Sequence, residues 1–301
     1  MRSLFIVNPA AGSARRWKTF VDSGPWPQEW SVKRTERRGQ ASVLALEGLA
    51  EGFSRIIAVG GDGTVSEAAH GLLQRRPLPA GFALAHLPAG SGCDFARHFG
   101  MPTDPAKWRG YLKRGKIAAI DAGRVSWTEC DGKPAERFFV NIAMAGLPGD
   151  IAHSMERSGK PLGGTMSYFA ASLAHIMGSK ARPVRLTCDA RAERTGKYHM
   201  LALANTKTTG GGMRIAPNAS AEDGFMDFIG VSDMTRTKLF LSFPKIYSGT
   251  HLKVPGIENF RARWVEAASD EPMRINIDGE ALGRLPARFE VMPAALPVVL
   301  P

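Results

Sequence analysis

The feature that most constrains the fold recurs three times within about the first 115 residues: a short apolar run, a glycine-bearing turn, and then a helical pattern. The runs are residues 4–7, 55–59 and 82–87, and the turns that follow them are residues 8–12, 60–64 and 88–92. This alternation is typical of a parallel sheet flanked by helices. Because ligands bind at the carboxyl ends of strands in open α/β sheets, we expect the three turns to form one crevice.

The chain changes texture after about residue 120. Strand candidates follow one another at residues 122–127, 137–142, 184–188, 198–204, 226–231, 260–266 and 273–277. They favour a mostly antiparallel second domain, a sandwich or a distorted barrel. Helical insertions are expected around residues 164–177, which could form either a lipid groove or a packed core helix, and around residues 237–247.

A chain of 301 residues is expected to form two domains. We place the first domain at residues 1–118 and the second, β-rich domain at residues 119–288. The apolar residues 289–301 are expected to dock on the N-terminal domain.

Composition limits the classes of protein that fit. No stretch approaches the roughly 18 apolar residues of a membrane span, and residues 4–7 are too short for a signal-peptide core. The cysteines, Cys93, Cys130 and Cys188, lack CxxC spacing, which argues against a disulfide framework or a zinc site. We therefore expect a cytoplasmic protein.

The formal charge of +11 attracts anions, but the basic residues form only short groups. No RNA-binding signature accompanies them, so no nucleic-acid partner is expected. The summed field suits peripheral, reversible contact with an anionic membrane surface.

The turn Gly60-Gly61-Asp62-Gly63-Thr64 indicates a phosphate site. Its glycines let the backbone N–H groups approach a polyphosphate, and the helix expected from Val65 points its positive end at the same anion. The negative charge of Asp62 is electrostatically unfavourable beside phosphates bound to these amides, unless a cation such as Mg²⁺ neutralises it. The structural alternative is a glycine-rich hairpin with aspartate at a turn position.

The turn at residues 90–94 repeats this plan. Ser91 supplies a hydroxyl donor and Asp94 a second carboxylate, although Asp94 could simply cap the helix at residues 95–99. Neither GxxxxGK[ST] nor GxGxxG is present, so the phosphate chemistry requires another scaffold.

Two acidic groups follow in the second half. Asp278 and Glu280 flank one glycine, so one could accept a proton from a hydroxyl while the other orients it or helps to hold a metal; an ordinary Asp-Gly turn is the alternative. In residues 220–227, Asp223 and neighbouring backbone carbonyls could bind a cation, although an exposed acidic turn is commoner.

In this order the motifs resemble the diacylglycerol kinase catalytic-domain family, which includes bacterial lipid kinases and the sphingosine and ceramide kinases. The resemblance covers nearly the whole chain. It matches residues 8–12 with an NPxSG turn, Thr35, Gly39 and Ala41 with TxxxGxA, residues 60–67 with GGDGTxxE, and residues 88–102 with PxGTxNDFARxLGIP. Further on, it matches residues 121–123, residues 139–141 and Gly146 with the entry to the second domain, residues 223–227 with DGxLD, and residues 278–280 with DGE. GGDGT alone also resembles NAD kinases and a phosphofructokinase turn.

The resemblance implies that residues 1–118 form an NAD kinase/phosphofructokinase-like α/β domain that binds the nucleotide. It implies that residues 119–288 form a β-sandwich that binds the lipid substrate. It implies an ATP site lined by Asn8, Pro9, Ala10, Ala11, Gly12, Thr35, Gly60, Gly61, Asp62, Gly63, Thr64, Glu67 and Ser91. Asp62 and Asp94 would organise Mg²⁺ and the phosphoryl group at the domain crevice, and Glu280, with Asp278 beside it, would activate the lipid hydroxyl. A structural Mg²⁺ would sit on Asp223 and the backbone oxygens of Ser220 and Phe225.

The expected reaction is transfer of the γ-phosphoryl group of ATP to a hydroxyl of a lipid such as diacylglycerol or a sphingoid base. The sequence departs from the family at Ser91, which keeps the usual hydroxyl, and at Cys93, which replaces an asparagine amide. Two alternatives are an NAD kinase-like small-molecule kinase and a non-catalytic nucleotide- or lipid-binding module. The sequence leaves homodimerisation open.

Overall fold

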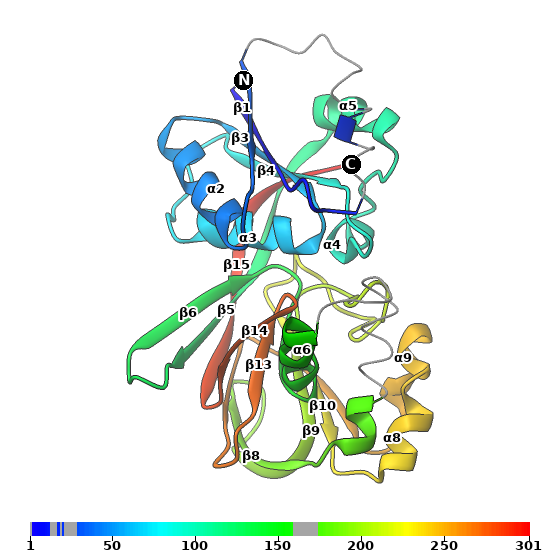
Figure 1. Cartoon of the computed structure of the whole chain (residues 1–301). Coiled ribbons are helices and arrows are strands. Elements are labelled where there is room, and N and C mark those ends of the chain that lie inside the picture. The colour runs from blue at the N-terminus through cyan, green and yellow to red at the C-terminus, as the bar shows by residue number, and fades with distance from the viewer. Residues whose placement is uncertain (1, 13–16, 19, 21–28, 159–173) are drawn as a thin grey trace. The chain divides into compact units, whose positions relative to one another are not determined.

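The structure, a computed structural model, describes residues 2–12, 17, 18, 20, 29–158 and 174–301 (Figure 1). It divides the chain into two compact units, Met1–Ile120 with Ala294–Pro301, and Asp121–Pro293. The first is an α/β unit with parallel strands, and the second is built from antiparallel strands. Most of the helical insertion predicted at residues 164–177 lies outside the described residues.

The first unit is organised around a parallel sheet. Its strands are β1 (Ser3–Val7), β2 (Trp30–Arg34), β3 (Arg55–Gly60) and β4 (Ala83–Pro88), in the order β2-β1-β3-β4. Every residue of β1, β3 and β4 is buried. Continuous apolar strands of this kind need cover on both faces, which the helices provide.

Helices cover both faces of this sheet. They are α2 (Gln40–Ala50), α3 (Asp62–Leu73), α4 (Asp94–His98) and α5 (Pro105–Arg114). Trp108 of α5 packs with Phe5 of β1, whereas Gly48 of α2 lies against Leu4 on the opposite face. Helices α2 and α3 touch where Gly71 faces the Ser42 carbonyl, which a Cβ on Gly71 would meet at 2.3 Å. Only glycine allows that approach.

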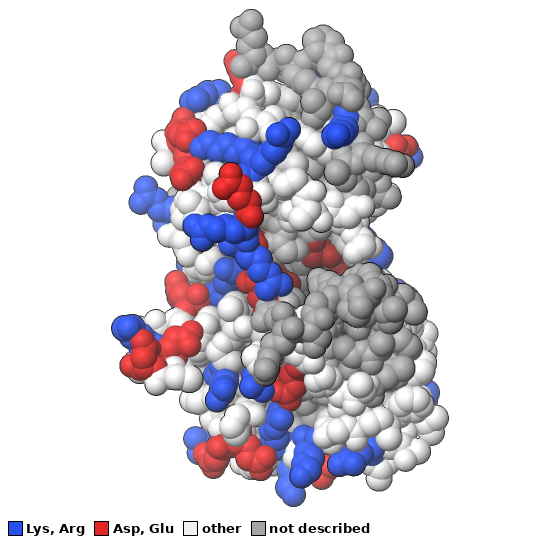
Figure 2. Space-filling model, viewed as in Figure 1, with Lys and Arg blue, Asp and Glu red and all other residues white. Residues whose placement is uncertain are grey.

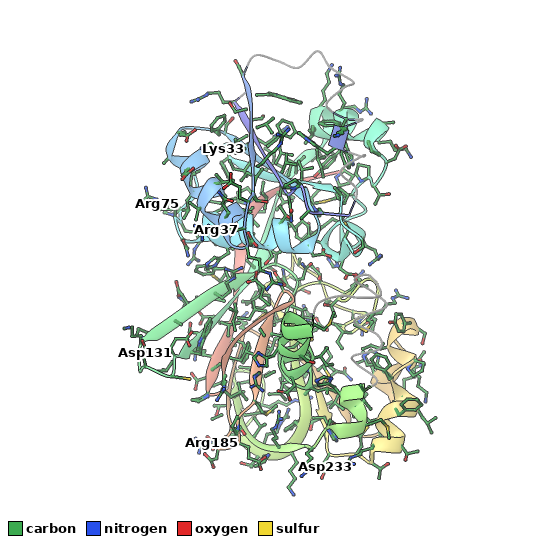
Figure 3. The ribbon with its side chains drawn as sticks, in the orientation of Figure 1. Lys33, Arg37, Arg75, Asp131, Arg185 and Asp233 are labelled. Atoms are coloured by element: carbon green, nitrogen blue, oxygen red, sulfur yellow. The ribbon has the colours of Figure 1, made fainter. Side chains whose placement is uncertain are left out.

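Salt bridges link the edge strand β2 to helix α2. Lys33, labelled in Figure 3, bonds Glu47 at 3.2 Å and Glu51 at 2.7 Å. The three side chains are substantially exposed, so these pairs contribute little to stability. On the face seen in Figure 2, Lys and Arg are interspersed with Asp and Glu in small groups.

The second unit holds strands that pair antiparallel. They are β5 (Lys116–Thr128), β6 (Pro134–Phe139), β7 (Ile142–Gly146), β8 (Arg182–Cys188), β9 (Arg194–Ala204), β10 (Met226–Ser232), β11 (Ile257–Ala262), β12 (Trp264–Ala268), β13 (Arg274–Ile277), β14 (Glu280–Arg284) and β15 (Ala287–Leu300). The path β14-β13-β7-β9-β8-β12-β15 runs through it, and β10 and β11 branch from β9. Strand β5 begins and β15 ends in the first unit, where Val298 pairs with Leu84 of β4.

Alternating residues of β9 face two different cores. Leu201 and Leu203 join the sandwich interior with Phe289, whereas Ala202 joins a second cluster with Ile246. Helices cover this second side. They are α6 (Leu147–Ser158), α8 (Arg236–Ser242), α9 (Lys245–Ser248) and the 3₁₀ turn η1 (Thr250–Lys253), of which α6 was not predicted.

Two predicted strands are each broken by an aspartate from elsewhere in the unit. The strand expected at residues 137–142 stops before Val140 and resumes at Ile142, because the Asp278 carboxylate accepts the backbone N–H groups between them. The strand expected at residues 260–266 breaks at Arg263, whose N–H bonds the Asp189 carboxylate. A backbone N–H held by a carboxylate is not available to a neighbouring strand.

Within the residues that the structure describes, no helix is long and apolar enough to cross a membrane.

Candidate active site

The turn after β3 opens directly into helix α3. Gly61 is the extended N-cap residue, and its carbonyl accepts the backbone N–H groups of Thr64 and Val65. The helix therefore begins at Asp62, three residues before the start predicted at Val65. The first-turn N–H groups of a 12-residue helix can then face an anion at the carboxyl end of β3.

The turns after β3 and β4 touch through their backbones. A Cβ added to Gly90 would lie 2.5 Å from the Gly61 Cα, so no side chain fits there. The Gly60 carbonyl accepts the Ala89 N–H at 2.8 Å and lies 3.1 Å from Nε2 of His86. His86 is fully buried on β4 and holds one side of the glycine turn.

His86 was missed by sequence reasoning. The only local signal was one histidine inside an otherwise apolar buried strand. Burial lowers the pKa of its imidazole to about 4, and the hydrogen bond to Gly60 opposes that shift. The ring is therefore neutral at pH 7 and donates through Nε2 to the carbonyl.

The first predicted turn is tied to the same place. Asn8 donates from Nδ2 to the Thr64 hydroxyl at 3.3 Å and accepts the Ala10 N–H at 3.0 Å. Thr35, directly after β2, is buried and donates its N–H to the Val7 carbonyl. The structure thus gathers residues 8–12, Thr35 and residues 60–64 at the carboxyl ends of neighbouring parallel strands.

Two other predicted residues, Ser91 and Glu67, differ in their exposure to solvent. Ser91 is exposed in the turn after β4, where its hydroxyl is accessible to solvent. Glu67 is buried, and its carboxylate accepts the backbone N–H of Ala41 at 3.1 Å. It thereby caps the first turn of α2.

Both predicted carboxylates of this unit lie where α4 begins. Asp62 accepts the Phe95 N–H at 2.9 Å. Asp94 is buried and pairs with Arg97, which also donates to the Gly92 carbonyl at 3.1 Å. Asp94 is thus the acidic residue in the first turn of α4, whose N-cap residue is Cys93.

The donor set around Asp62 fits Mg²⁺. The Phe95 N–H engages one carboxylate oxygen of this half-exposed residue, and the second oxygen can bind a hard cation. The described part of the chain contains no group of three or more His, Cys, Asp or Glu side chains that could hold a metal by itself. A Mg²⁺ ion bound here would take its remaining ligands from nucleotide phosphates and water.

In the second unit, Asp278 and Gly279 form the two-residue turn between β13 and β14. Both have positive φ, 48° and 94°, as a type I′ hairpin turn requires. The Asp278 carboxylate accepts backbone N–H groups from three successive residues, Val140 at 3.0 Å, Asn141 at 3.0 Å and Ile142 at 2.8 Å. Asp278 and Gly279 thus do form the Asp-Gly turn that was the alternative to a catalytic pair.

Glu280, the first residue of β14, is held by an arginine. Oε2 of Glu280 lies 2.9 Å from Nη2 of Arg137 on β6, and the two side chains are only 22% and 14% exposed. Nε of Arg137 is buried without a hydrogen-bond partner among the described residues. Arg137 was missed by sequence reasoning, and no local pattern points to it, because its partner lies 143 positions away.

The acidic loop before β10 is paired with arginine. Asp223 forms an ion pair with Arg261 and accepts the Phe225 N–H at 3.1 Å. Burial raises the pKa of Asp227 to about 6, against the Arg261 charge and with a further rise from Asp223. The Ser220 hydroxyl oxygen accepts the Glu222 N–H at 3.4 Å. Mg²⁺ binding at Asp223 stays a prediction.

Family comparisons agree with this architecture. Residues 2–125 match the model of the diacylglycerol kinase catalytic domain, and residues 141–300 match the YegS C-terminal NAD kinase beta sandwich-like domain. A diacylglycerol kinase of Mycobacterium tuberculosis is 33% identical over 264 residues, which cover 87% of this chain and 81% of that protein.

Solved structures show the same fold. A crystal structure of a diacylglycerol kinase from Bacillus anthracis matches with a TM-score of 0.74 and 20% identity, covering 100% of this chain and 97% of that one. Yeast NADH kinase matches with a TM-score of 0.57 and 11% identity, covering 99% and 82%. The predicted fold class, an NAD kinase-like α/β unit followed by an antiparallel β-sandwich, is confirmed. With 33% of the 264 aligned residues identical to the mycobacterial enzyme over most of both chains, the protein belongs to the diacylglycerol kinase family of lipid kinases.

Proposed function

We propose that the chain transfers the γ-phosphoryl group of ATP to a hydroxyl of a membrane lipid such as diacylglycerol or a sphingoid base. The observation that carries this proposal is the convergence of the glycine turns after β3 and β4 at the N-terminus of α3, with Asp62 among them. A backbone cradle beside a carboxylate suits a polyphosphate held with a divalent cation.

In this proposal the first unit binds the nucleotide. The N–H groups at the start of α3 hydrogen-bond the phosphates, and the hydroxyl of Ser91 adds a donor from the neighbouring turn. Asp62 holds Mg²⁺, with Asp94 supporting the start of α4. A cation held there would supply charge neutralisation for the transferred phosphoryl group.

The second unit supplies the base. Glu280 accepts the proton of the lipid hydroxyl, and Arg137 orients the carboxylate through the contact at 2.9 Å. Asp278 affects Glu280 indirectly, because its carboxylate binds the backbone of residues 140–142 next to the end of β6. Loss of Asp278 would therefore displace Glu280 without removing a group that contacts the substrate.

Three further expectations belong to the same proposal. Asp223 and the backbone oxygens of Ser220 and Phe225 would hold a structural Mg²⁺. The protein works in the cytoplasm and binds an anionic membrane surface reversibly. Cys93 replaces the family asparagine with a thiol that donates to the Gly90 carbonyl at 3.4 Å, so the turn geometry is kept by a weaker donor.

The deciding experiment incubates the purified protein with labelled ATP and a lipid extract, and identifies the lipid that acquires label. NAD is offered in a parallel reaction, because the NAD kinase-like fold leaves that acceptor as the alternative. Asp62→Asn is the control for a contaminating kinase. Labelled lipid with the wild type and none with the variant supports the proposal, whereas labelled NADP alone overturns it.

A further inference from the structure

Helices α8 and α9 have an inner and an outer apolar face. Leu239 and Ile246 are buried in clusters with the sheet residues Val231 and Ile229. The outer face carries large side chains that remain 42% exposed at Phe240, 65% at Leu241 and 39% at Tyr247. They are three of the seven exposed large hydrophobic residues of the described chain, and all fall within eight positions.

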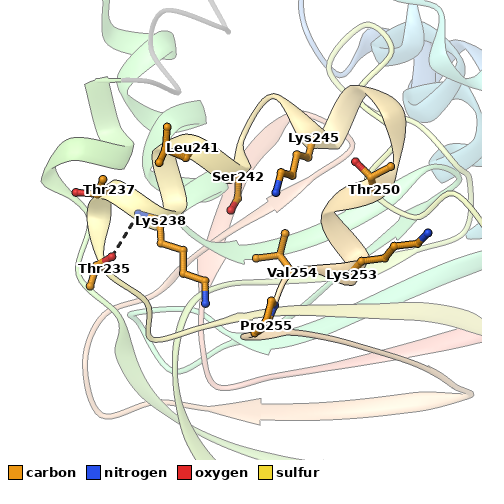
Figure 4. A pocket seen from close by; sticks show the side chains of 10 residues that line it. All are labelled: Thr235, Thr237, Lys238, Leu241, Ser242, Lys245, Thr250, Lys253, Val254 and Pro255. Carbon is orange, nitrogen blue, oxygen red and sulfur yellow. Dashed lines mark hydrogen bonds between the residues drawn. The ribbon is translucent and has the colours of Figure 1, made fainter.

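Of these three side chains, Leu241 lines a basic hollow. This hollow of about 650 Å³ is also lined by Lys238, Lys245 and Lys253, together with Val254 and Pro255. Figure 4 shows Lys238 and Lys245 extending from the helices toward the apolar floor, while Lys253 turns away. Among the residues that the structure describes, no carboxylate lines the hollow.

The local sequence keeps acidic groups away. The residues between Asp233 and Glu258 include four lysines and arginines and no aspartate or glutamate. None of the three lysines of the hollow forms an ion pair with a carboxylate in the described ranges. The surface therefore combines uncompensated positive charge with exposed apolar side chains.

We propose that α8, α9 and η1 form a docking surface for an anionic phospholipid bilayer. The Phe240, Leu241 and Tyr247 side chains enter the interface between headgroups and acyl chains, and the lysines contact lipid phosphates. The inference rests on the proposed action on a membrane lipid, and it names the part of the chain that meets the bilayer.

The pattern fits a bilayer better than a solvated surface. Water solvates lysine side chains well, but exposing the neighbouring Phe240 and Leu241 side chains to water is unfavourable in free energy. At a bilayer the same residues act together, because apolar groups partition into the interface while lysines are attracted by the negative surface potential. Neither part alone gives strong binding, so attachment is reversible and depends on salt.

The test measures vesicle co-sedimentation of the full chain without ATP. Vesicles of phosphatidylcholine mixed with phosphatidylglycerol are compared with vesicles of phosphatidylcholine alone. Replacing Lys238, Lys245 and Lys253 together by Gln should weaken binding to the anionic vesicles by about fivefold per lysine, on the order of 10²-fold in all. Phe240→Ser combined with Leu241→Ser should lower the binding that remains at high salt.

A matched control removes the same charge elsewhere in the second unit. Lys133, Arg185 and Lys197 are exposed, and Arg185 is labelled in Figure 3. Replacing these three by Gln should change binding less than threefold, within the loss expected for one surface lysine. Equal losses in the two triple variants, or no loss in the first, would overturn the proposal.

Two further measurements separate membrane docking from dimerisation and from catalysis. Sedimentation velocity of the Phe240 and Leu241 double variant detects a contact between copies: a dimer that dissociates while vesicle binding is unchanged overturns membrane docking. Turnover on a water-soluble short-chain diacylglycerol should be equal in wild type and the lysine variant. A wild type that binds vesicles through these lysines but phosphorylates no lipid would leave the docking surface standing and defeat the proposed function.

Discussion

The carboxylate of Asp62 accepts a hydrogen bond of 2.9 Å from the backbone N–H of Phe95, and so joins the turn after β3 to the start of α4. One residue thus has two tasks in the proposed reaction. It fixes the relation between two phosphate-facing turns and presents an oxygen to a cation. The two tasks can be separated by substitution, because an amide oxygen can accept the same hydrogen bond without carrying charge.

Asp62→Asn should therefore abolish most turnover and leave the fold in place. Removing one preorganised charge-stabilising group typically lowers kcat on the order of 10²- to 10³-fold. The melting temperature should stay near that of wild type, whereas Asp62→Ala should lower both activity and stability because the Phe95 N–H loses its acceptor. Wild-type turnover in the Asn variant would refute the metal and phosphate assignment.

Gly90→Ala tests the contact between the two glycine turns. The added Cβ would lie 2.5 Å from the Gly61 Cα, and backbone cannot yield as a flexible side chain would. Overpacking of this kind costs about 1–3 kcal/mol of unfolding free energy. We expect the displaced turn to raise the KM for ATP as well.

Gly178→Ala serves as the control for Gly90→Ala. Nothing lies within 4 Å of a Cβ at Gly178, which lies in a helical turn. This variant should have unchanged KM and equal or slightly higher stability. If Gly90→Ala has the same KM and stability as wild type, the two turns are not in backbone contact.

His86 predicts a dependence of stability on pH. Burial lowers its pKa from 6.5 to about 4 in the folded chain, so the unfolded chain binds more protons between these values. The stabilisation is complete above pH 6.5 and is lost as pH falls toward 4, by about 3 kcal/mol at most. In urea titrations at pH 7 and pH 4.5, His86→Phe should lose less stability on acidification than wild type; an equal loss would contradict a buried neutral imidazole.

Much of the first unit was predictable because its signals are local. Buried runs such as residues 55–59 and the glycines that follow them lie within one strand and one turn. The boundaries of β7 and β12 were not predictable, because Asp278 and Asp189 reach them from 136 and 74 positions away. Arg137 was not predicted for the same reason, because a salt bridge between β6 and β14 produces no local sequence pattern near either residue.

Asp278 should be a structural residue of the second unit. Its carboxylate accepts three backbone N–H groups, and an unsatisfied buried donor costs about 1–3 kcal/mol. Asp278→Ala should therefore destabilise the protein by several kcal/mol, and Asp278→Asn by less, because one oxygen remains to accept from Asn141 and Ile142. Thermal unfolding measures both, and an Ala variant as stable as wild type would show that the three bonds are not formed.

Glu280→Gln tests the base in the proposed transfer. A lipid hydroxyl is a weak nucleophile at neutral pH, and an acceptor of its proton contributes on the order of 10²- to 10⁴-fold to the rate. Glutamine keeps the size of the side chain and can still accept from Nη2 of Arg137, so stability and the KM for ATP should change little while kcat falls by that factor.

The matched variant is Arg137→Gln, which leaves the carboxylate of Glu280 but removes the contact that orients it. It should lower kcat by a smaller factor, and the double variant should be no slower than Glu280→Gln alone, because an arginine that acts only through Glu280 has no effect once the carboxylate is gone. Additive losses in the double variant would mean that Arg137 contacts the substrate itself, and full activity of Glu280→Gln would return the residue to the structural role of a hairpin salt bridge.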